Sequence, residues 1–195
     1  MVPLGLLLGA ILLGLVAVFA IAIPKLHGDG DIALPDTLPG GFTATDVPAA
    51  YKNVPSSAKS QVATYIKGEK KSAEFSDKAL KDAYGSGQTR TYVNLTPKSQ
   101  SSIVVTAFHS DGGAFAPLAI TDPSTAAQQG GGDVLVSADD VVCIQHLAAS
   151  QTGATQTAYF ECQKSQNGLT VQVTSQAQSL SGAVKTTNTV YKAVS

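Results

Sequence analysis

Polar and apolar positions alternate along several segments in the second half of the chain. These segments are rich in β-branched and aromatic residues, which suit the pleated and half-buried geometry of a β-strand. They cover residues 89–95, 102–109, 141–147, 156–164 and 169–175. Antiparallel strands with this alternation bury one face and expose the other. The pattern therefore predicts an antiparallel sheet of about five strands.

Helical spacing precedes and follows these strands. Residues 42–88 predict two helices, one ending at Gly68 and a shorter one running from Ser76 to Gly85. Residues 180–194 have a looser apolar spacing and predict a last helix, although their threonines disfavour one. Because a helix buries its apolar stripe against a neighbouring layer, the predicted fold class is α+β with helices on one face of the sheet.

A long segment without regular spacing separates the second and third predicted strands. It covers residues 111–133, carries few charges and ends in a run of glycines. Loops of that length are usually either functional or disordered. We expect a surface loop that is a candidate contact region for a partner.

The N-terminal segment is the most apolar part of the chain. From Leu4 to Ile23, 20 consecutive residues carry no charged or polar side chain. A helix of this length spans a hydrocarbon core about 30 Å thick. Residues 1–23 are therefore predicted to form a single-pass transmembrane anchor that contacts the lipid bilayer through residues 4–23.

Two alternatives concern this apolar segment. Ala20 and Ala22 fit the small residues that precede a signal-peptide cleavage point, although no Lys or Arg precedes the apolar run. Gly5 and Gly9 have the spacing of membrane helices that approach closely, which allows a homodimer through the anchor. A glycine-rich apolar segment also produces this spacing by chance.

A tether is predicted directly after the anchor. Residues 24–41 contain three prolines and four glycines and have no helical or alternating periodicity. Such a composition is typical of a linker. The predicted organisation is an anchor over 1–23, a tether over 24–41 and an extracytoplasmic α+β domain over 42–195.

The charge of the chain narrows the class of partner. It has 13 Lys and Arg against 14 Asp and Glu, so its net charge is -1. No positive field is available to concentrate nucleic acid around it, and nucleic-acid binding is not expected. Charged residues make up only 14% of the chain. A polar but weakly charged surface suits a secreted or envelope domain.

The only two cysteines are Cys143 and Cys162. Asn167 and Gly168 stand between two alternating runs and predict a two-residue hairpin turn. Residues directly opposite each other in a hairpin share one face of the sheet. This register places Cys162 opposite Val173, on the apolar face.

A turn centred between Thr152 and Gly153 places Cys143 directly opposite Cys162, within reach of a bond. We predict a disulfide, which persists in an oxidising compartment and therefore favours an extracytoplasmic domain. The alternative is a pair of inert buried thiols. Lys25, directly after the anchor, points to the opposite orientation by the positive-inside rule.

The candidates for chemistry are few. His109 and Asp111 flank a turn, and the cysteine register places His146 across from Tyr159. A lone His on a half-covered sheet face is more often a surface residue than a site. The histidines, with His27, lack metal-ligand spacing. No catalytic residue, metal site or cofactor is predicted.

Three stretches carry a resemblance. They are LPDTLPGGFTATD at 34–46, SIVVTAFHSDGGAFAP at 102–117, and GDVLVSADDVVCIQ with YFECQKSQNGLTVQV within 132–173. In these stretches the chain resembles uncharacterised single-pass membrane-anchored envelope proteins of actinobacteria. The resemblance implies a location at the cell membrane, and it implies no activity or functional residue.

We therefore expect a membrane-tethered extracytoplasmic interaction or binding module of the cell envelope, with an envelope protein as its possible partner. One alternative is a carrier of a small ligand or lipid, with a pocket between helices and sheet. Another is a hydrolase that uses His109, Asp111 or His146 with a serine.

Overall fold

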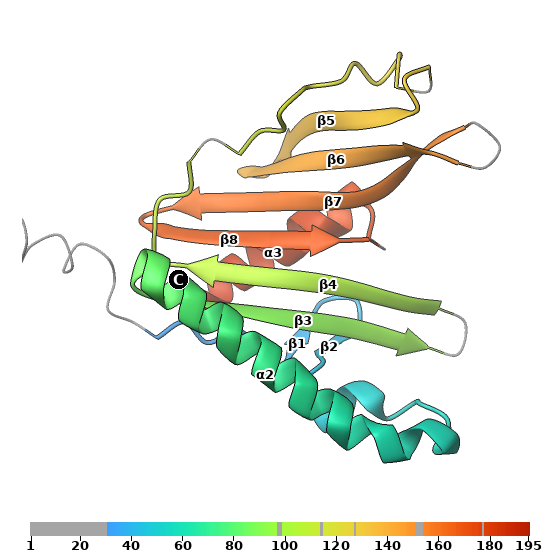
Figure 1. Ribbon diagram of the computed structural model, residues 1–195. Helices are drawn as coiled ribbons and strands as arrows, with labels where there is room; N and C mark the ends of the chain where they lie inside the picture. The colour runs from blue at the N-terminus through green and yellow to red at the C-terminus, as the bar shows by residue number, and fades with distance from the viewer. Residues whose placement is uncertain (1–30, 97–98, 114, 127, 151–153, 177) are drawn as a thin grey trace, which may run out of the picture. The chain divides into compact units, whose positions relative to one another are not determined.

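One antiparallel sheet of eight strands organises the structure, a computed structural model (Figure 1). The residues that it describes are 31–96, 99–113, 115–126, 128–150, 154–176 and 178–195. The strands lie in the order β1-β2-β3-β4-β8-β7-β6-β5, and every neighbouring pair is antiparallel. The sheet therefore consists of two meanders, β1–β4 and β5–β8, which join where β4 pairs with β8.

The strands differ greatly in length. Their bounds are β1 Thr37–Leu38, β2 Phe42–Ala44, β3 Gly87–Thr96, β4 Ser99–Phe108, β5 Gly131–Ala138, β6 Val141–Ala149, β7 Thr155–Gln166 and β8 Leu169–Ser175. The helices are the short 3-10 turns η1 Pro48–Tyr51 and η2 Ser56–Ala58, followed by α2 Lys59–Tyr84 and α3 Leu180–Val194. The α+β class and the antiparallel sheet are confirmed.

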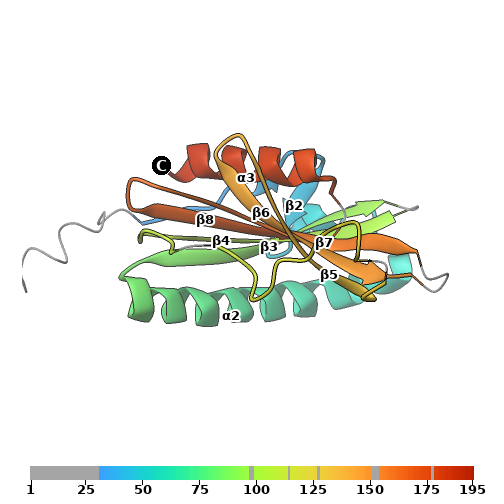
Figure 2. The same ribbon diagram turned by 90° about the horizontal axis from the view of Figure 1, so that it is seen from above.

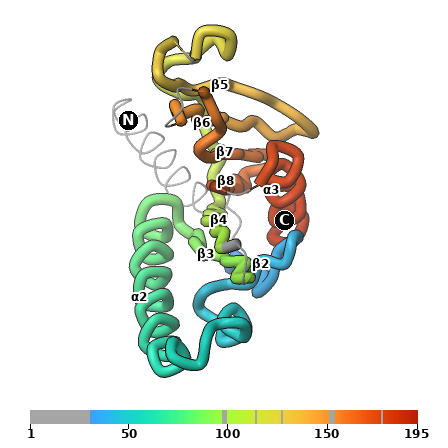
Figure 3. Tube along the Cα trace, turned by 90° about the vertical axis from the view of Figure 1, so that its right-hand side faces the viewer, coloured from blue at the N-terminus to red at the C-terminus, as the bar shows by residue number. Residues whose placement is uncertain are grey.

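The α-helices of the described residues, α2 and α3, cover opposite faces of the sheet (Figures 2 and 3). The prediction of helices on one face is therefore wrong. The two helices bury different amounts of surface. Helix α3 buries six of its residues, whereas α2 buries none. Because α2 buries little apolar surface, it can pack on the more polar face of the sheet.

The α3 face carries the main core. Tyr92, Ile103, Val105, Val171 and Val173 are almost fully buried and pack with α3. A second cluster brings the two cysteines together with α3 further along the same face. Ser179 caps α3, because its hydroxyl accepts a hydrogen bond from the Gly182 N–H at 3.2 Å.

Helix α3 forms although threonines disfavour helices. The hydroxyl of the buried Thr187 donates to the Ala183 carbonyl at 2.9 Å, one turn back along the helix. Thr186 is also buried and exchanges hydrogen bonds with the Gln178 side chain. Both hydroxyls are therefore satisfied inside the core, and the prediction of a C-terminal helix is confirmed.

Helix α2 runs without interruption through Gly68, so the prediction of two helices in this region is wrong. A glycine inside a helix costs about 1 kcal/mol relative to alanine, which neighbouring residues of a 26-residue helix offset. The predicted end at Gly85 is confirmed. Gly85 has a φ of 83°, and its N–H donates to the Lys81 carbonyl.

Three strands were not predicted. β1 and β2 contain only two and three residues, too few for alternation to be recognised. β5 begins with Gly131 and Gly132, inside the segment predicted to be a loop. Its hairpin with β6 turns through Asp139 and Asp140, both with positive φ.

The cysteine register is confirmed. Cys143 lies opposite Cys162, and Cys162 lies opposite Val173. The two cysteines form a disulfide and both are fully buried. Beyond His146 the β6–β7 register shifts by a bulge. The predicted turn between residues 152 and 153 lies outside the described residues.

The folded body begins inside the predicted tether. Its compact unit starts at Asp31, and Leu34 and Leu38 are buried in the main core. In the part of the chain with described coordinates, no helix is both long and apolar enough to cross a membrane. The predicted anchor, residues 1–23 with Gly5 and Gly9, lies outside that part.

Candidate functional site

A groove separates the first half of α2 from the neighbouring ends of β3 and β4. Its volume is about 670 Å³, and it is open to solvent. The described residues that line it are Tyr51, Val54, Ala58, Gln61, Val62, Tyr65, Val93, Leu95, Gln100, Ser101, Ser102 and Gln176. They come from η1, the loop between η1 and η2, η2, α2, β3, β4 and the residue that follows β8.

The local sequence explains why this space stays open. Ala58, Val62 and Tyr65 follow one another at helical spacing and line the groove from the α2 side. Across from them, Val93 pairs with Ser102 and Leu95 pairs with Gln100 in the β3–β4 ladder. A small or polar residue therefore stands beside each apolar one on the floor of the groove.

At the other end of α2 the helix lies closer to the sheet. A Cβ added to Gly87 would stand 2.7 Å from the Leu80 Cβ, so only glycine permits this approach. The Tyr84 and Phe108 rings stack there, with centroids 4.5 Å apart. The helix therefore packs closely on the sheet at this end, and the groove lies at the other end, above the small or polar residues that accompany Val93 and Leu95.

Two tyrosines form an ordered wall of the groove. The Tyr51 hydroxyl donates to the Thr45 carbonyl at 2.8 Å. The Tyr51 and Tyr65 rings meet edge to face, with centroids 5.7 Å apart. Tyr65 remains 53% exposed. Partial burial, and then the nearby Glu69, raise the pKa of the Tyr65 hydroxyl.

The described lining of the groove contains no charged side chain. Its polar groups are the amides of Gln61, Gln100 and Gln176 and the hydroxyls of tyrosines and serines. Amides and hydroxyls both donate and accept hydrogen bonds. Such a lining can bind an uncharged ligand that has both apolar and polar parts.

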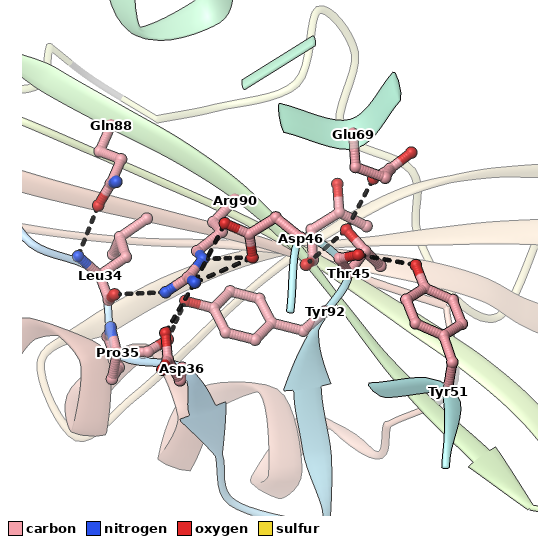
Figure 4. A network of polar contacts seen from close by, with 11 residues as sticks. Leu34, Pro35, Asp36, Thr45, Asp46, Tyr51, Glu69, Gln88, Arg90 and Tyr92 are labelled. Atoms are coloured by element: carbon pink, nitrogen blue, oxygen red, sulfur yellow. Dashed lines mark hydrogen bonds and ion pairs between the residues drawn. The ribbon is translucent and has the colours of Figure 1, made fainter. Parts of the chain in front are cut away.

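Arg90 forms a polar network beside the groove (Figure 4). Its guanidinium donates to both carboxylate oxygens of Asp46, at 3.0 and 3.1 Å, and to Asp36 at 2.7 Å. It also donates to the Leu34 carbonyl at 2.8 Å. The Arg90 side chain is only 11% exposed. These contacts hold the N-terminal segment of the body against β3.

The same segment has two further contacts. The Tyr92 hydroxyl donates to the Pro35 carbonyl at 2.7 Å, and the Leu34 N–H donates to the Gln88 side chain at 2.6 Å (Figure 4). On the other side of β2, the Thr45 hydroxyl donates to the Glu69 carboxylate of α2 at 2.7 Å. The network therefore joins residues 34–36 to β3 and joins α2 to the end of β2, which is a structural role.

Among the described residues, His109 pairs with a serine and with no acid. Its Nδ1 lies 2.7 Å from the Ser86 Oγ. Asp111, the other candidate nearby, instead accepts a hydrogen bond from the Gly168 N–H at 3.0 Å. Ser86 directly follows the C-terminal cap of α2, where helix carbonyls disfavour a developing negative charge. The pair is a poor start for acyl transfer.

His146 lies between two acids on the face opposite α3. Its Nδ1 is 2.7 Å from an Asp133 oxygen. Its Nε2 is 3.4 Å from a Glu161 oxygen, an ion-pair distance without the alignment of a hydrogen bond. The ring stacks on Tyr159, across from it as predicted, with centroids 4.1 Å apart. These contacts orient the imidazole and present no nucleophile to it.

The predicted candidates His109, Asp111 and His146 thus lie outside the groove. Within the described ranges, no three His, Cys, Asp or Glu side chains are placed to hold a metal ion. Sequence reasoning missed the groove residues, because glutamine, serine and valine at ordinary spacing carry no motif. The helical spacing of Val62 and Tyr65 was the one signal from this region.

Comparison with known proteins assigns no family and no function to the chain. No family model, no curated protein and no solved structure matches the chain.

Proposed function

We propose that this protein is a membrane-tethered extracytoplasmic binding module, and that the groove between α2 and the sheet is its ligand site. The observation that carries the proposal is the groove itself. Its volume of about 670 Å³ falls within the range of small-molecule sites. Its lining combines aliphatic, aromatic and uncharged polar side chains.

The proposed location is supported by two features. The Cys143–Cys162 disulfide is stable in an oxidising compartment and uncommon in a reducing one. The apolar run of residues 4–23 has the length of a membrane-spanning helix. Together they favour a body held outside the cytoplasm by an N-terminal anchor.

The alternatives have weaker support. A hydrolase would need a base oriented by an acid beside a nucleophile, and the Ser86–His109 pair has no such acid in the described structure. A lipid carrier would enclose its ligand in a dry cavity. This groove is open, and polar residues line it. A binding module needs neither an acid nor an enclosed cavity.

The proposal is tested by filling the groove. Ser102 lies on its floor, opposite Val93, so Ser102→Phe places a ring in the space. The matched control is Ser137→Phe, an exposed position on the same sheet face at the far edge strand β5. Each variant is made in the full chain, labelled with nitrogen-15 and held in unlabelled lipid nanodiscs.

The probes are a set of neutral tetrasaccharides, a neutral monoacylglycerol and inorganic phosphate. We expect at least one uncharged probe to shift the amide signals of Gln61 and Gln100 saturably. Ser102→Phe should abolish this shift, and Ser137→Phe should preserve it. The proposal fails if no uncharged probe binds, or if binding is the same in Ser102→Phe.

A further inference from the structure

We infer that the groove binds a neutral, hydroxyl-rich ligand, namely a segment of an uncharged oligosaccharide. This inference rests on the proposed function and names the ligand class of the same site. Three properties of the groove carry it: the absence of charge in its described lining, the number of its amides, and the exposed ring of Tyr65.

The lining disfavours a charged ligand. An ionised group that leaves water loses its hydration and needs an opposite charge or several hydrogen bonds in return. The described residues that line the groove offer no cation for a phosphate or a carboxylate. The carboxylate of Glu69, beside Tyr65, adds a negative charge near one wall. An anionic ligand is therefore left without an oppositely charged partner among these residues.

The lining equally disfavours a plain alkyl chain. Gln61, Gln100 and Gln176 each carry two N–H donors and an oxygen acceptor. Covering an amide with hydrocarbon leaves these donors and acceptors without hydrogen-bond partners, which weakens binding. Sugar hydroxyls both donate and accept, so they can replace the water that solvates these amides.

Tyr65 supplies the apolar contact that such a ligand needs. One face of a sugar ring presents C–H groups with a partial positive charge, and these groups are attracted to the negative face of an aromatic ring. Tyr65 is 53% exposed, and Tyr51 supports its ring edge to face. Tyr51 is itself held by the hydrogen bond from its hydroxyl to the Thr45 carbonyl. The Tyr65 ring is therefore ordered before a ligand binds to it.

The test separates the ligand class from the existence of a site. Gln61→Leu with Gln100→Leu removes two amides and keeps side chains of similar size. Both positions are exposed, so the fold should tolerate the change. Gln156→Leu, an exposed glutamine of β7 outside the groove, is the matched control. Circular dichroism melting verifies that all three proteins are folded.

The probes are neutral α- and β-linked tetrasaccharides of glucose, mannose, galactose and N-acetylglucosamine, with the same monoacylglycerol for comparison. Binding is measured by nuclear magnetic resonance, with the full chain in nanodiscs. We expect at least one tetrasaccharide to bind at millimolar concentration or below. The double leucine variant should bind it about tenfold more weakly, as expected for the loss of amide hydrogen bonds. Gln156→Leu should bind it as the unchanged protein does.

Three results overturn the inference. If only the monoacylglycerol binds, and the leucine variant binds it more tightly, the ligand is apolar and the groove remains a binding site. If neither the tetrasaccharides nor the monoacylglycerol shifts the groove signals, the proposed function fails together with the ligand class. Saccharide binding that is unaffected by the leucine substitutions also contradicts the inference, because it places the sugar elsewhere.

Discussion

At the scale of single residues, Asp77 shows how burial and hydrogen bonding compete on α2. Its carboxylate accepts a hydrogen bond from the Thr89 N–H at 2.7 Å and so fastens the helix to β3. Burial raises the pKa of this carboxyl, and the hydrogen bond from Thr89 lowers it by less. The charged form of Asp77 is therefore less favourable in the folded protein than in the unfolded chain.

Asp77→Asn should stabilise the protein at neutral pH. The amide oxygen can still accept from the Thr89 N–H, and the partly buried charge is gone. A carboxyl whose pKa is raised on folding contributes its stability below the unfolded pKa, and this contribution is lost as pH rises through the folded value. The advantage of the variant should therefore be present at pH 7 and disappear below about pH 4.

Urea unfolding at pH 7 and below about pH 4 measures the difference in stability between Asp77→Asn and the unchanged protein. Asp82→Asn is the control, because Asp82 lies in an exposed ion pair with Lys78 and its loss changes stability little. An Asp77→Asn variant that is less stable than the unchanged protein at neutral pH would show that the carboxylate hydrogen bond outweighs burial.

The pairing of the two cysteines could be predicted from single residues and their spacing. Asn167 and Gly168 define a hairpin of fixed register, and residue alternation extends that register to both cysteines. The contacts of His146 could be predicted only in part. Tyr159 follows from the register, whereas Asp133 comes from β5, a strand that the sequence pattern did not reveal.

At the scale of elements, α2 illustrates why a glycine can be misinterpreted. Gly68 and Gly85 look alike as helix-ending signals, but only Gly85 has the positive φ that favours glycine. Gly68 is inside the helix, and a Cβ added there meets no atom within 4 Å. Packing of the helix on β3 decides which glycine ends it.

The two glycines should therefore respond to alanine in opposite directions. Gly68→Ala should stabilise the protein by about 0.5–1 kcal/mol, because alanine restricts the unfolded chain and favours the helix. Gly85→Ala should destabilise it by about 1 kcal/mol, because alanine is strained at a φ of 83°. Urea unfolding of each variant measures both effects. Destabilisation by Gly68→Ala would contradict the continuous helix.

The groove belongs to the element scale and could not be derived from the sequence. Its existence depends on how α2 lies across β3 and β4, which is a tertiary relationship. The spacing of Val62 and Tyr65 identifies the inner side of the helix and says nothing of the distance to the sheet. That distance depends on pairs such as Val93 with Ser102, which follow only once the strands are aligned.

At the scale of the whole molecule, the disulfide joins β6 to β7 beneath α3 and links stability to the redox state of the compartment. It closes a loop with a sequence separation of 19. The double variant Cys143→Ala, Cys162→Ala should lose about 3 kcal/mol of unfolding free energy by the chain-entropy model. Urea unfolding of the oxidised protein and the variant measures this loss.

The compartment is tested in cells that produce the protein naturally. Cells are lysed in urea that contains a polyethylene glycol maleimide, so that buried thiols are exposed, with or without prior reduction, and the added mass is read on a gel. We expect no label without reduction and two labels after it, as the chain has two cysteines. The alanine double variant should take no label in either case. Labelling of unreduced protein would contradict an oxidising location.

The contacts of Arg90 also have a mechanical consequence. They fasten residues 34–36 to β3, so a pull that arrives from the N-terminal side must first break these contacts. The next contacts to break are those of the short β1–β2 ladder at the edge of the sheet, followed by those of the long pair β3 and β4. In a copy held by its N-terminal segment, tension would therefore load the ion pair and hydrogen bonds of residues 34–36 before it reaches the strands that form the floor of the groove.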